Sequence, residues 1–239
     1  MTKQKPSPKH SSKRPDGRTA TQLRDISAKT GVIKNADGSA MFQIGKTVAY
    51  AAVYGPRELH PKFLQNPEKG VLRCNYNMMA FSGSGERVRP GPSRRSREIS
   101  LVIQKALLPV LSLEQYPNSV IDVYIELLQT DAGTRCAGIC AASMALADAG
   151  IPMKDLVTAV AVGIVNGQPV VDLSKEEEDL DGAVDIAVGM LPRTKHVVLL
   201  QMDGTIKKTD FAEALRLVEQ ASKDIYAIQT RALRERYTT

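Results

Sequence analysis

The sequence predicts a mixed α/β fold, of the α+β kind, built from two similar β/α units. Alternating and apolar runs typical of strands recur in both halves of the 239-residue chain. In each half, a segment with helical spacing of apolar residues follows the strands. Glycine and proline turns separate these segments. The order indicates a duplicated unit, although residue identities alone do not establish the repeat.

The composition indicates a basic protein of a reducing compartment. The chain has 32 Lys and Arg against 26 Asp and Glu and a net charge of +6, which favours a polyanionic partner. Its three cysteines are too few for a disulfide framework, and Cys136 and Cys140 are expected to be buried thiols. The N-terminus lacks the apolar core of a secretory signal, and no apolar run is long enough to span a bilayer. We therefore expect a cytoplasmic protein without membrane association.

The chain divides into three parts. Residues 1–15 are rich in Lys, Ser and Pro and predict a flexible basic tail, which aids solubility or contacts nucleic acid. Residues 16–153 form the first structured half, which Gly150 and Pro152 end. Residues 154–239 form the second half.

Strands and a long loop open the first half. A hairpin and a further strand are predicted across residues 32–54. Residues 55–70 contain three prolines and mixed charge, which predicts a long loop. Arg57, His60 and Lys62 make this loop a candidate RNA-contacting rim. Strand character resumes over residues 71–80.

An arginine-rich segment precedes the first predicted helix. Residues 86–98 (ERVRPGPSRRSRE) hold five arginines and no lysine. Pro92 is suited to open a helix, which places Arg94 and Arg95 at its start. Cations are disfavoured at a helix N-terminus, so arginine there argues for bound anions rather than for a solvated face. The predicted buried stripe comprises Ile99, Val102, Ile103, Ala106, Leu107 and Val110.

A turn between a strand and a helix is the candidate anion site. The strand covers residues 120–129, and Asp131-Ala132-Gly133-Thr134-Arg135 leads from it into an alanine-rich helix. Gly133 has no side chain, so an anion can approach the backbone closely there. Thr134 and Arg135 lie at the start of the helix, where its first N–H groups are free. A helix N-terminus carries about half a positive charge and unpaired donors. Arg135 adds a planar fork suited to phosphate oxygens. An ordinary turn with a surface arginine accounts for these five residues equally well.

The second half predicts four strands and a closing helix. Asn166-Gly167 is a strong hairpin signal between the first two strands. Asp210 and Glu213 predict a capping box for the final helix. The strands are expected over residues 156–165, 169–173, 184–191 and 196–202, and the inward helix residues are Phe211, Leu215, Val218, Ile225, Ile228 and Leu233.

An acidic stretch lies between these strands. Most of its members, including Glu176, Glu177 and Glu178, are expected in a solvated loop. Asp179 and Asp185 are stronger candidates, because Asp185 opens a strand and Asp179 lies across a glycine turn from it. A carboxyl among other carboxyls has its charged form disfavoured and can act as an acid.

These features together fit phosphorolysis. Arginines and a helix terminus can hold a free phosphate and a phosphodiester, while an aspartic acid protonates the departing 3′ oxygen. No Ser-His-Asp or Cys-His arrangement is evident, and the three histidines are too dispersed for a triad or a zinc site.

Six spaced motifs resemble the RNase PH family, and in particular the catalytic RNase PH-like subunits of archaeal exosomes. They span about residues 14–239 in the family's order: RPDGR, PSRRS-RE, LQTDAGTR, AASMALADAGIPM, DLSKEEEDLDGAVD and LLQMDG. The resemblance implies a duplicated β/α unit of the RNase PH type (ribosomal protein S5 domain 2-like) that forms rings around an RNA channel.

The resemblance also implies which residues bind anions. Gly133, Thr134 and Arg135 match the family's phosphate-binding turn. Arg94 and Arg95 match the paired arginines that bind phosphate and the RNA backbone.

The resemblance to the family also implies which residues are catalytic and which line the RNA channel. Asp179 matches the general acid and Asp185 its partner; the acidic stretch is one residue longer than in relatives, so Asp179 is assigned by its spacing to Asp185. A basic channel-loop residue is expected at Lys62 or Arg57. Magnesium held by Asp179 and Asp185 is compatible with these residues, which do not require it.

The implied activity is a processive, phosphate-dependent 3′→5′ exoribonuclease that acts on single-stranded RNA. Inorganic phosphate is the co-substrate, nucleoside diphosphates are the products, and the reverse reaction adds RNA tails. The implied partners are a homologous non-catalytic RNase PH-like subunit, alternating with this chain in a hexameric ring, and RNA-binding cap subunits.

Three alternatives remain. A tRNA-trimming RNase PH homo-oligomer differs mainly in overall resemblance. A non-catalytic RNA-binding ring subunit usually lacks the paired arginines or the aspartates, and this chain has both. A metal-dependent hydrolytic nuclease leaves the Gly-Thr-Arg turn unexplained.

Overall fold

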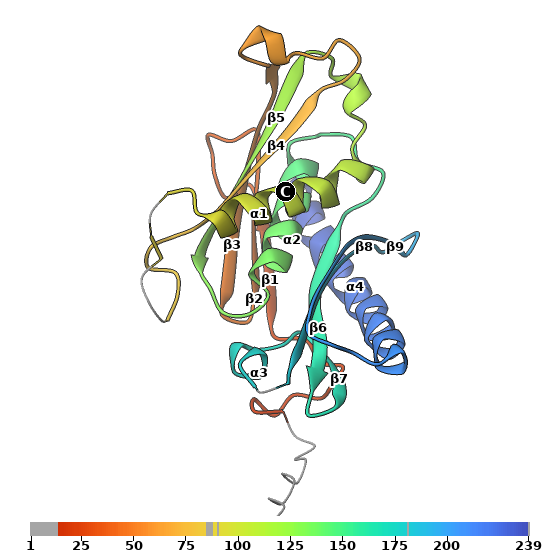
Figure 1. Cartoon of the computed structure of the whole chain (residues 1–239). Coiled ribbons are helices and arrows are strands. Elements are labelled where there is room, and N and C mark those ends of the chain that lie inside the picture. Colours follow the sequence, from red (N-terminus) through yellow and green to blue (C-terminus); the bar gives the residue numbers. More distant parts are fainter. Residues whose placement is uncertain (1–13, 85–87, 90, 181, 239) are drawn as a thin grey trace, which may run out of the picture.

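The computed structural model describes residues 14–84, 88–89, 91–180 and 182–238. Of the predicted features, residues 1–13 of the tail, Arg87 and Asp181 lie outside this range. The fold is the predicted mixed α/β arrangement of two units, each a sheet followed by a helix (Figure 1).

The first unit holds a five-stranded sheet in the order β1-β2-β3-β5-β4. Its strands are β1 (Ile26–Thr30), β2 (Gly38–Ile44), β3 (Thr47–Glu58), β4 (Val71–Met78) and β5 (Ser119–Gln129). Neighbouring strands are antiparallel except β4 and β5, which run parallel because α1 (Arg94–Leu107) crosses over between them. Short 3₁₀ turns cover Lys62–Leu64, Leu108–Val110 and Leu113–Gln115.

Two expectations for this unit were wrong. β1 was missed, because it is a short edge strand whose alternating residues are only half covered. The predicted loop over residues 55–70 begins as strand, since β3 continues to Glu58, and it then forms the 3₁₀ turn at Lys62–Leu64. A bulge between Tyr54 and Arg57 lets β3 continue past a proline without losing its pairing with β5.

Helix α1 begins within the arginine-rich segment, at Arg94, two residues after Pro92, which was expected to open it. Ser93 is the N-cap: its side chain accepts a hydrogen bond from Ser96 N, and Ser96 Oγ accepts one from Ser93 N. Pro92 therefore precedes the cap rather than opening the helix. Of the predicted stripe, Ile99, Ile103, Ala106 and Leu107 are buried in the helix, Val102 is half-buried, and Val110 is buried in the 3₁₀ turn that follows.

Helix α2 (Thr134–Asp148) lies between the two sheets and packs on both. Nearly all of its residues are buried, so it shows no single apolar stripe. Its alanines allow the sheets to approach closely, as the sequence predicted. This packing fixes the N-terminus of α2 against the second unit.

The second unit holds a four-stranded antiparallel sheet in the order β7-β6-β8-β9. Its elements are β6 (Thr158–Val165), β7 (Gln168–Val171), α3 (Lys175–Glu178), β8 (Val184–Leu191), β9 (His196–Asp203) and α4 (Lys208–Tyr237). Asn166 and Gly167 both have positive φ, which confirms the predicted tight hairpin.

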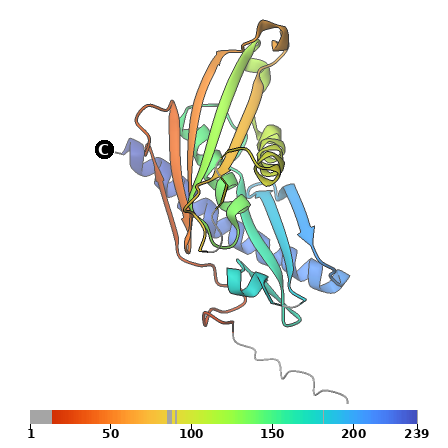
Figure 2. The same cartoon turned by 60° about the vertical axis from the view of Figure 1, so that its left-hand side comes forward.

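The predicted capping box at Asp210 and Glu213 is wrong. Helix α4 starts earlier, with Lys207 at the N-cap and no side-chain cap, so Asp210 lies in the first turn instead. An acidic residue there still stabilises the helix terminus. The long helix packs across β6, β7 and β1 (Figure 2). Within the described residues, none of the helices combines the length and the apolarity needed to cross a bilayer.

Candidate active site

Elements of both units enclose a cleft of about 460 Å³. Its walls come from the N-terminal ends of α1 and α2, from α3 and from the β8-β9 pair. Six of the residues predicted from the sequence line it: Arg95, Gly133, Thr134, Arg135, Asp179 and Asp185. The structure thus brings the cations and the carboxylates, which lie up to 90 residues apart, to one place.

The start of α2 forms the cationic side of the cleft. Gly133 is its N-cap and has a φ of 70°, a left-handed conformation that favours glycine. Thr134 and Arg135 open the helix, so their free N–H groups belong to its partly positive end. Arg95 reaches the same cleft from α1. This side can therefore hold an anion.

A relay of side chains orients Arg135. Its Nη1 donates to Gln201 Oε1 at 2.7 Å, and Gln201 Nε2 donates to Glu98 Oε1 at 3.3 Å. The relay connects α2, β9 and α1. Gln201 was not singled out from the sequence, because its relation to Arg135 exists only in the folded chain.

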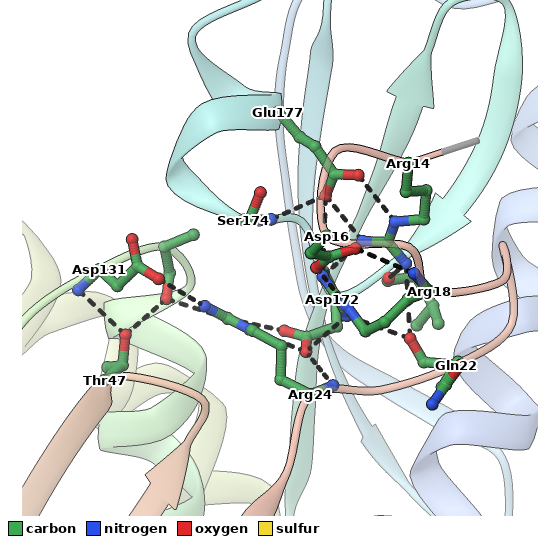
Figure 3. A network of polar contacts seen from close by, with 12 residues as sticks. Arg14, Asp16, Arg18, Gln22, Arg24, Thr47, Asp131, Asp172, Ser174 and Glu177 are labelled. Atoms are coloured by element: carbon green, nitrogen blue, oxygen red, sulfur yellow. Dashed lines mark hydrogen bonds and ion pairs between the residues drawn. The ribbon is translucent and has the colours of Figure 1, made fainter. Parts of the chain in front are cut away.

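A threonine at the start of β3 holds the turn that leads into α2. Thr47 Oγ1 donates to Ala132 O at 2.8 Å and accepts from Asp131 N at 3.1 Å (Figure 3). Thr47 is fully buried, so these bonds are shielded from water. The turn is therefore held in one conformation from the side of the first sheet.

Asp185 lies on the acidic side, in β8, directly opposite Asp203 of β9. Its Oδ1 is buried and has no hydrogen-bond partner among the described residues. Burial raises the pKa of Asp185, Asp203 raises it further, and Arg135 and Arg95 oppose the shift. A proton thus resides on Asp185 at higher pH than on an ordinary aspartate.

Glu178 is a cleft residue that the sequence interpretation assigned to a solvated loop. It is half-buried at the end of α3, and the carboxylate of Asp185 lies near it. Burial and Asp185 raise the pKa of Glu178 to about 7, against the opposing effects of Lys175 and the Gly133 N–H. Glu178 is therefore a candidate proton carrier at neutral pH.

Glu177 was also wrongly placed in a solvated loop. Its side chain is fully buried and forms a two-pronged ion pair with Arg14, at 2.7 Å for both Nε–Oε1 and Nη2–Oε2. Arg14, which was expected in the flexible tail, is buried as well. The acidic segment and the start of the described chain are thereby fixed to each other.

Asp179 caps the C-terminal end of α3 and is exposed to the cleft. Its Oδ1 accepts a hydrogen bond from Lys175 Nζ at 2.6 Å. From the sequence, Asp179 was chosen because other carboxylates were expected to crowd it. In the structure, the carboxyls with such neighbours are Asp185 and Glu178. Lys175, which lines the cleft, was missed because an i,i+4 lysine in an acidic run is usually a surface residue.

The remaining predicted RNA contacts lie outside the cleft. Arg94 is exposed beside Arg95 but does not line it. Arg57 pairs with Val120 at the far end of β3. Val71 of β4 pairs with the same residue, and the cleft residue Met78 lies seven positions further along β4, about 23 Å away at about 3.3 Å per residue. Arg57 contacts Asp37 at 3.3 Å and stacks over Tyr54. Lys62, in the 3₁₀ turn beyond it, is exposed.

The described residues provide neither a cluster of metal ligands nor an activated thiol. Across the described residues, no group of three or more His, Cys, Asp and Glu side chains is placed to hold a metal ion. Cys136 and Cys140 are buried, as expected, and burial raises the pKa of Cys140 to about 12. Neither thiol is therefore an activated nucleophile.

The arrangement can bind an anion beside three carboxyls, of which Glu178 has a pKa raised to about 7. Arg95, Arg135 and the end of α2 supply the anion site, and the carboxyls of Glu178, Asp179 and Asp185 stand opposite. Such a cleft suits the transfer of a phosphoryl group between two oxygens, where positioning and charge stabilisation supply most of the catalysis.

Comparison with known proteins identifies the family. The model of the 3′ exoribonuclease family, RNase PH, matches domain 1 over residues 22–152 and domain 2 over residues 155–221. The exosome complex component Rrp41 of Thermococcus kodakarensis is 55% identical over 225 residues, which cover 94% of this chain and 90% of that protein.

Solved structures share the fold. Rrp46 of rice superposes with a TM-score of 0.82 at 26% identity, covering 92% of this chain and 100% of that one. A chain of the Archaeoglobus fulgidus exosome with RNA bound to the active site gives a TM-score of 0.74 at 24% identity, over 95% and 93% of the two chains.

Proposed function

The chain belongs to the RNase PH family of 3′ exoribonucleases, and from this premise we propose that it is the catalytic subunit of an archaeal exosome. It removes nucleotides from the 3′ end of single-stranded RNA by phosphorolysis. The observation that carries the proposal is the shared cleft, in which Arg95 and Arg135 stand opposite Asp179 and Asp185.

Phosphate binds at the cationic side of the cleft. The N–H groups at the start of α2 and the Arg135 guanidinium hold the free phosphate. Arg95 contacts both this phosphate and the terminal phosphodiester, and Arg94 contacts the RNA backbone outside the cleft. These contacts carry no base-specific information, so little sequence preference is expected.

The chemical step exchanges one P–O bond for another. An oxygen of the bound phosphate attacks the phosphorus of the terminal diester, and the bond to the 3′ oxygen of the preceding ribose breaks. Asp179 donates the proton that this oxygen takes up, and Lys175 holds its carboxyl in place. The products are a nucleoside diphosphate and an RNA one nucleotide shorter. Run backwards, the same step extends RNA and releases phosphate.

Magnesium fits the acidic side only in part. Mg²⁺ is commonly held by one or two carboxylates together with substrate phosphate oxygens. Asp185, with its unpartnered Oδ1, and Asp179 would hold it there, and the ion would neutralise charge on the phosphates. The protein's own residues carry out the binding and proton transfer.

RNA reaches the cleft through a ring of subunits. This chain alternates with a homologous non-catalytic RNase PH-like subunit in a hexameric ring, with RNA-binding cap subunits above it. The edge strand β9 supports this assembly, because its Val197, Leu200 and Met202 side chains are exposed and, among the described residues, only β8 pairs with it. Arg57 and Lys62 lie on the RNA path before the cleft.

Product identity tests the proposal. A short single-stranded RNA is incubated with the chain, alone and with its ring partner, in the presence and absence of inorganic phosphate. Nucleoside diphosphates that appear only with phosphate are expected. Nucleoside monophosphates released without phosphate would instead establish a hydrolytic nuclease.

A further inference from the structure

Three arginines of the segment between Arg14 and Arg24 lie outside the cleft and are surrounded by carboxylates, one of which, Asp131, lines the cleft (Figure 3). Arg14, Arg18 and Arg24 contact Asp16, Asp131, Asp172 and Glu177. The segment belongs to the first unit, whereas Asp172 and Glu177 belong to the second. The network therefore ties the two units together beside the active site.

Arg24 and Asp172 form the centre of this network. Arg24 Nε donates to Asp172 Oδ2 at 2.9 Å and Nη2 donates to Oδ1 at 2.7 Å, a paired fork. Arg24 N also donates to Asp172 Oδ2, at 2.8 Å. The Asp172 side chain is 1% exposed and that of Arg24 is 9% exposed. This shielding fixes the direction in which the guanidinium points.

The other edge of the Arg24 guanidinium faces the turn before α2. Its Nη1 donates to Asp131 Oδ2 at 3.2 Å, and its Nη2 donates to Ala132 O at 3.3 Å. It also lies against Gly133, where an added Cβ would stand 3.5 Å from Nη2. The turn is thus held between Thr47 on one side and Arg24 on the other.

Arg24 is not placed to bind phosphate itself. Asp172 occupies its fork, and Arg24 does not line the cleft that holds Arg95 and Arg135. Its contacts are instead with the residues that set the direction of the first N–H groups of α2. An error of about 1 Å in such a group can lower a rate by as much as about 10²-fold.

Arg14, in the same network, serves as a control for Arg24. The Arg14 side chain is 5% exposed, close to the 9% of Arg24, and it forms an equally close fork with Glu177. It also donates to Val171 O and Asp172 O, at 2.9 and 2.8 Å. None of its hydrogen bonds within the described residues goes to residues 131–133.

We propose that Arg24, oriented by Asp172, is a positioning residue for phosphate: it fixes the turn Asp131–Gly133 so that the end of α2 and Arg135 face the bound anion. The inference rests on the proposed function, which assigns phosphate to this turn. Lysine cannot replace Arg24, because a single ammonium cannot reach Asp172 and the turn together with the same geometry.

The test compares Arg24→Lys with Arg14→Lys in the full chain assembled with its ring partner. Arg24→Lys is expected to raise the KM for phosphate by about tenfold or more and to change the KM for RNA little. Arg14→Lys makes the same change in an equally buried arginine and should leave the KM for phosphate near that of the unmodified chain. Melting temperatures report whether each variant is folded.

A binding measurement gives a readout independent of turnover. Calorimetric titration of the full chain with inorganic phosphate should show weaker binding by Arg24→Lys. Asp172→Asn, which leaves Arg24 in place but removes the charge that orients it, should weaken binding in the same direction. This second variant keeps the inference testable where Arg24→Lys does not fold.

The results distinguish failure of the positioning role of Arg24 from failure of the proposed phosphorolytic function. RNA decay by the unmodified chain that does not depend on phosphate would overturn the proposed function. Normal phosphate dependence in the unmodified chain, together with an unchanged KM for phosphate in Arg24→Lys, would overturn only the positioning role. An equal rise in Arg24→Lys and Arg14→Lys would also overturn it, because the effect would then reflect general loosening of the network.

Discussion

Asp185 and Asp203 lie directly opposite each other on β8 and β9, and both line the cleft that Arg135 enters from the other unit. Their like charges and the burial of Asp185 raise the pKa of Asp185. Glu178, close to Asp185, has a pKa raised to about 7. On the acidic side of the cleft, Glu178 therefore takes up and releases a proton near pH 7, and Asp185 keeps its proton to a higher pH than an ordinary aspartate.

Phosphate affinity should depend on pH through Glu178. Above pH 7 the ionised carboxylate, which faces the Gly133 N–H, competes with phosphate for the end of α2. The KM for phosphate should therefore rise as pH increases through about 7, and Glu178→Gln should flatten this rise. Phosphate's own ionisation affects both proteins equally in matched buffers, so parallel profiles for the two proteins would contradict the prediction.

The same residue should make stability depend on pH. The folded pKa of Glu178 is raised above its ordinary value of 4.5, so its contribution to stability is full below 4.5 and is lost as pH rises through about 7. Glu178→Gln should therefore gain melting temperature relative to the unmodified chain over this range. Glu176→Gln, a change at an exposed neighbour, serves as the control and should follow the unmodified chain.

Asp179→Asn should lower turnover by roughly 10²- to 10⁴-fold, the usual contribution of a general acid. RNA affinity, measured by fluorescence anisotropy, should remain near normal, because the exposed carboxyl does not hold the fold together. A large loss of RNA binding would show that Asp179 binds substrate rather than donating a proton.

Arg135→Ala should raise the phosphate requirement by about tenfold or more, since a charge-assisted hydrogen bond contributes about 1.5–3 kcal/mol. Arg95→Ala should act in the same direction. Arg94→Ala is the matched control, because Arg94 adjoins Arg95 but lies outside the cleft. It should weaken RNA binding without changing the KM for phosphate; equal effects of Arg94→Ala and Arg95→Ala on that KM would contradict the assignment.

Lys62→Ala and Arg57→Ala should affect long RNA only. Arg57 lies level with Val71, about 23 Å along β4 from the cleft residue Met78 at about 3.3 Å per residue, and Lys62 lies in the turn beyond the end of β3. A very short RNA bound in the cleft is therefore not expected to reach them. For long RNA, each lost phosphate contact should reduce the slope of log affinity against log salt by about 0.7. Equal losses for long and short RNA would place the two residues closer to the reaction than the fold does.

Local sequence predicted the parts of the site that depend on neighbouring residues. The anion-binding turn follows from Gly133 and the start of the helix after it, and the hairpin follows from Asn166-Gly167. The arginine pair at the start of α1 was predicted for the same reason. Helix termini and tight turns are set by interactions within a few residues, which the sequence displays directly.

The errors concern residues whose environment is formed by distant segments. Glu177 is buried only because Arg14 approaches from 163 residues away. Glu178 and Asp203 face the cleft only because α3 and β9 pack beside Asp185. The capping box predicted at Asp210 is the exception: Lys207 precedes α4 instead, although a helix terminus is a local feature.

The sequence by itself determined the family, the mixed α/β architecture and the types of residue available for anion binding and proton transfer. Only the tertiary structure decided which carboxyls have a raised pKa and which arginines support the site instead of binding substrate. The physical reason is that a pKa and an ion pair depend on burial and on charges a few ångströms away. Those distances arise only when the two units close around α2.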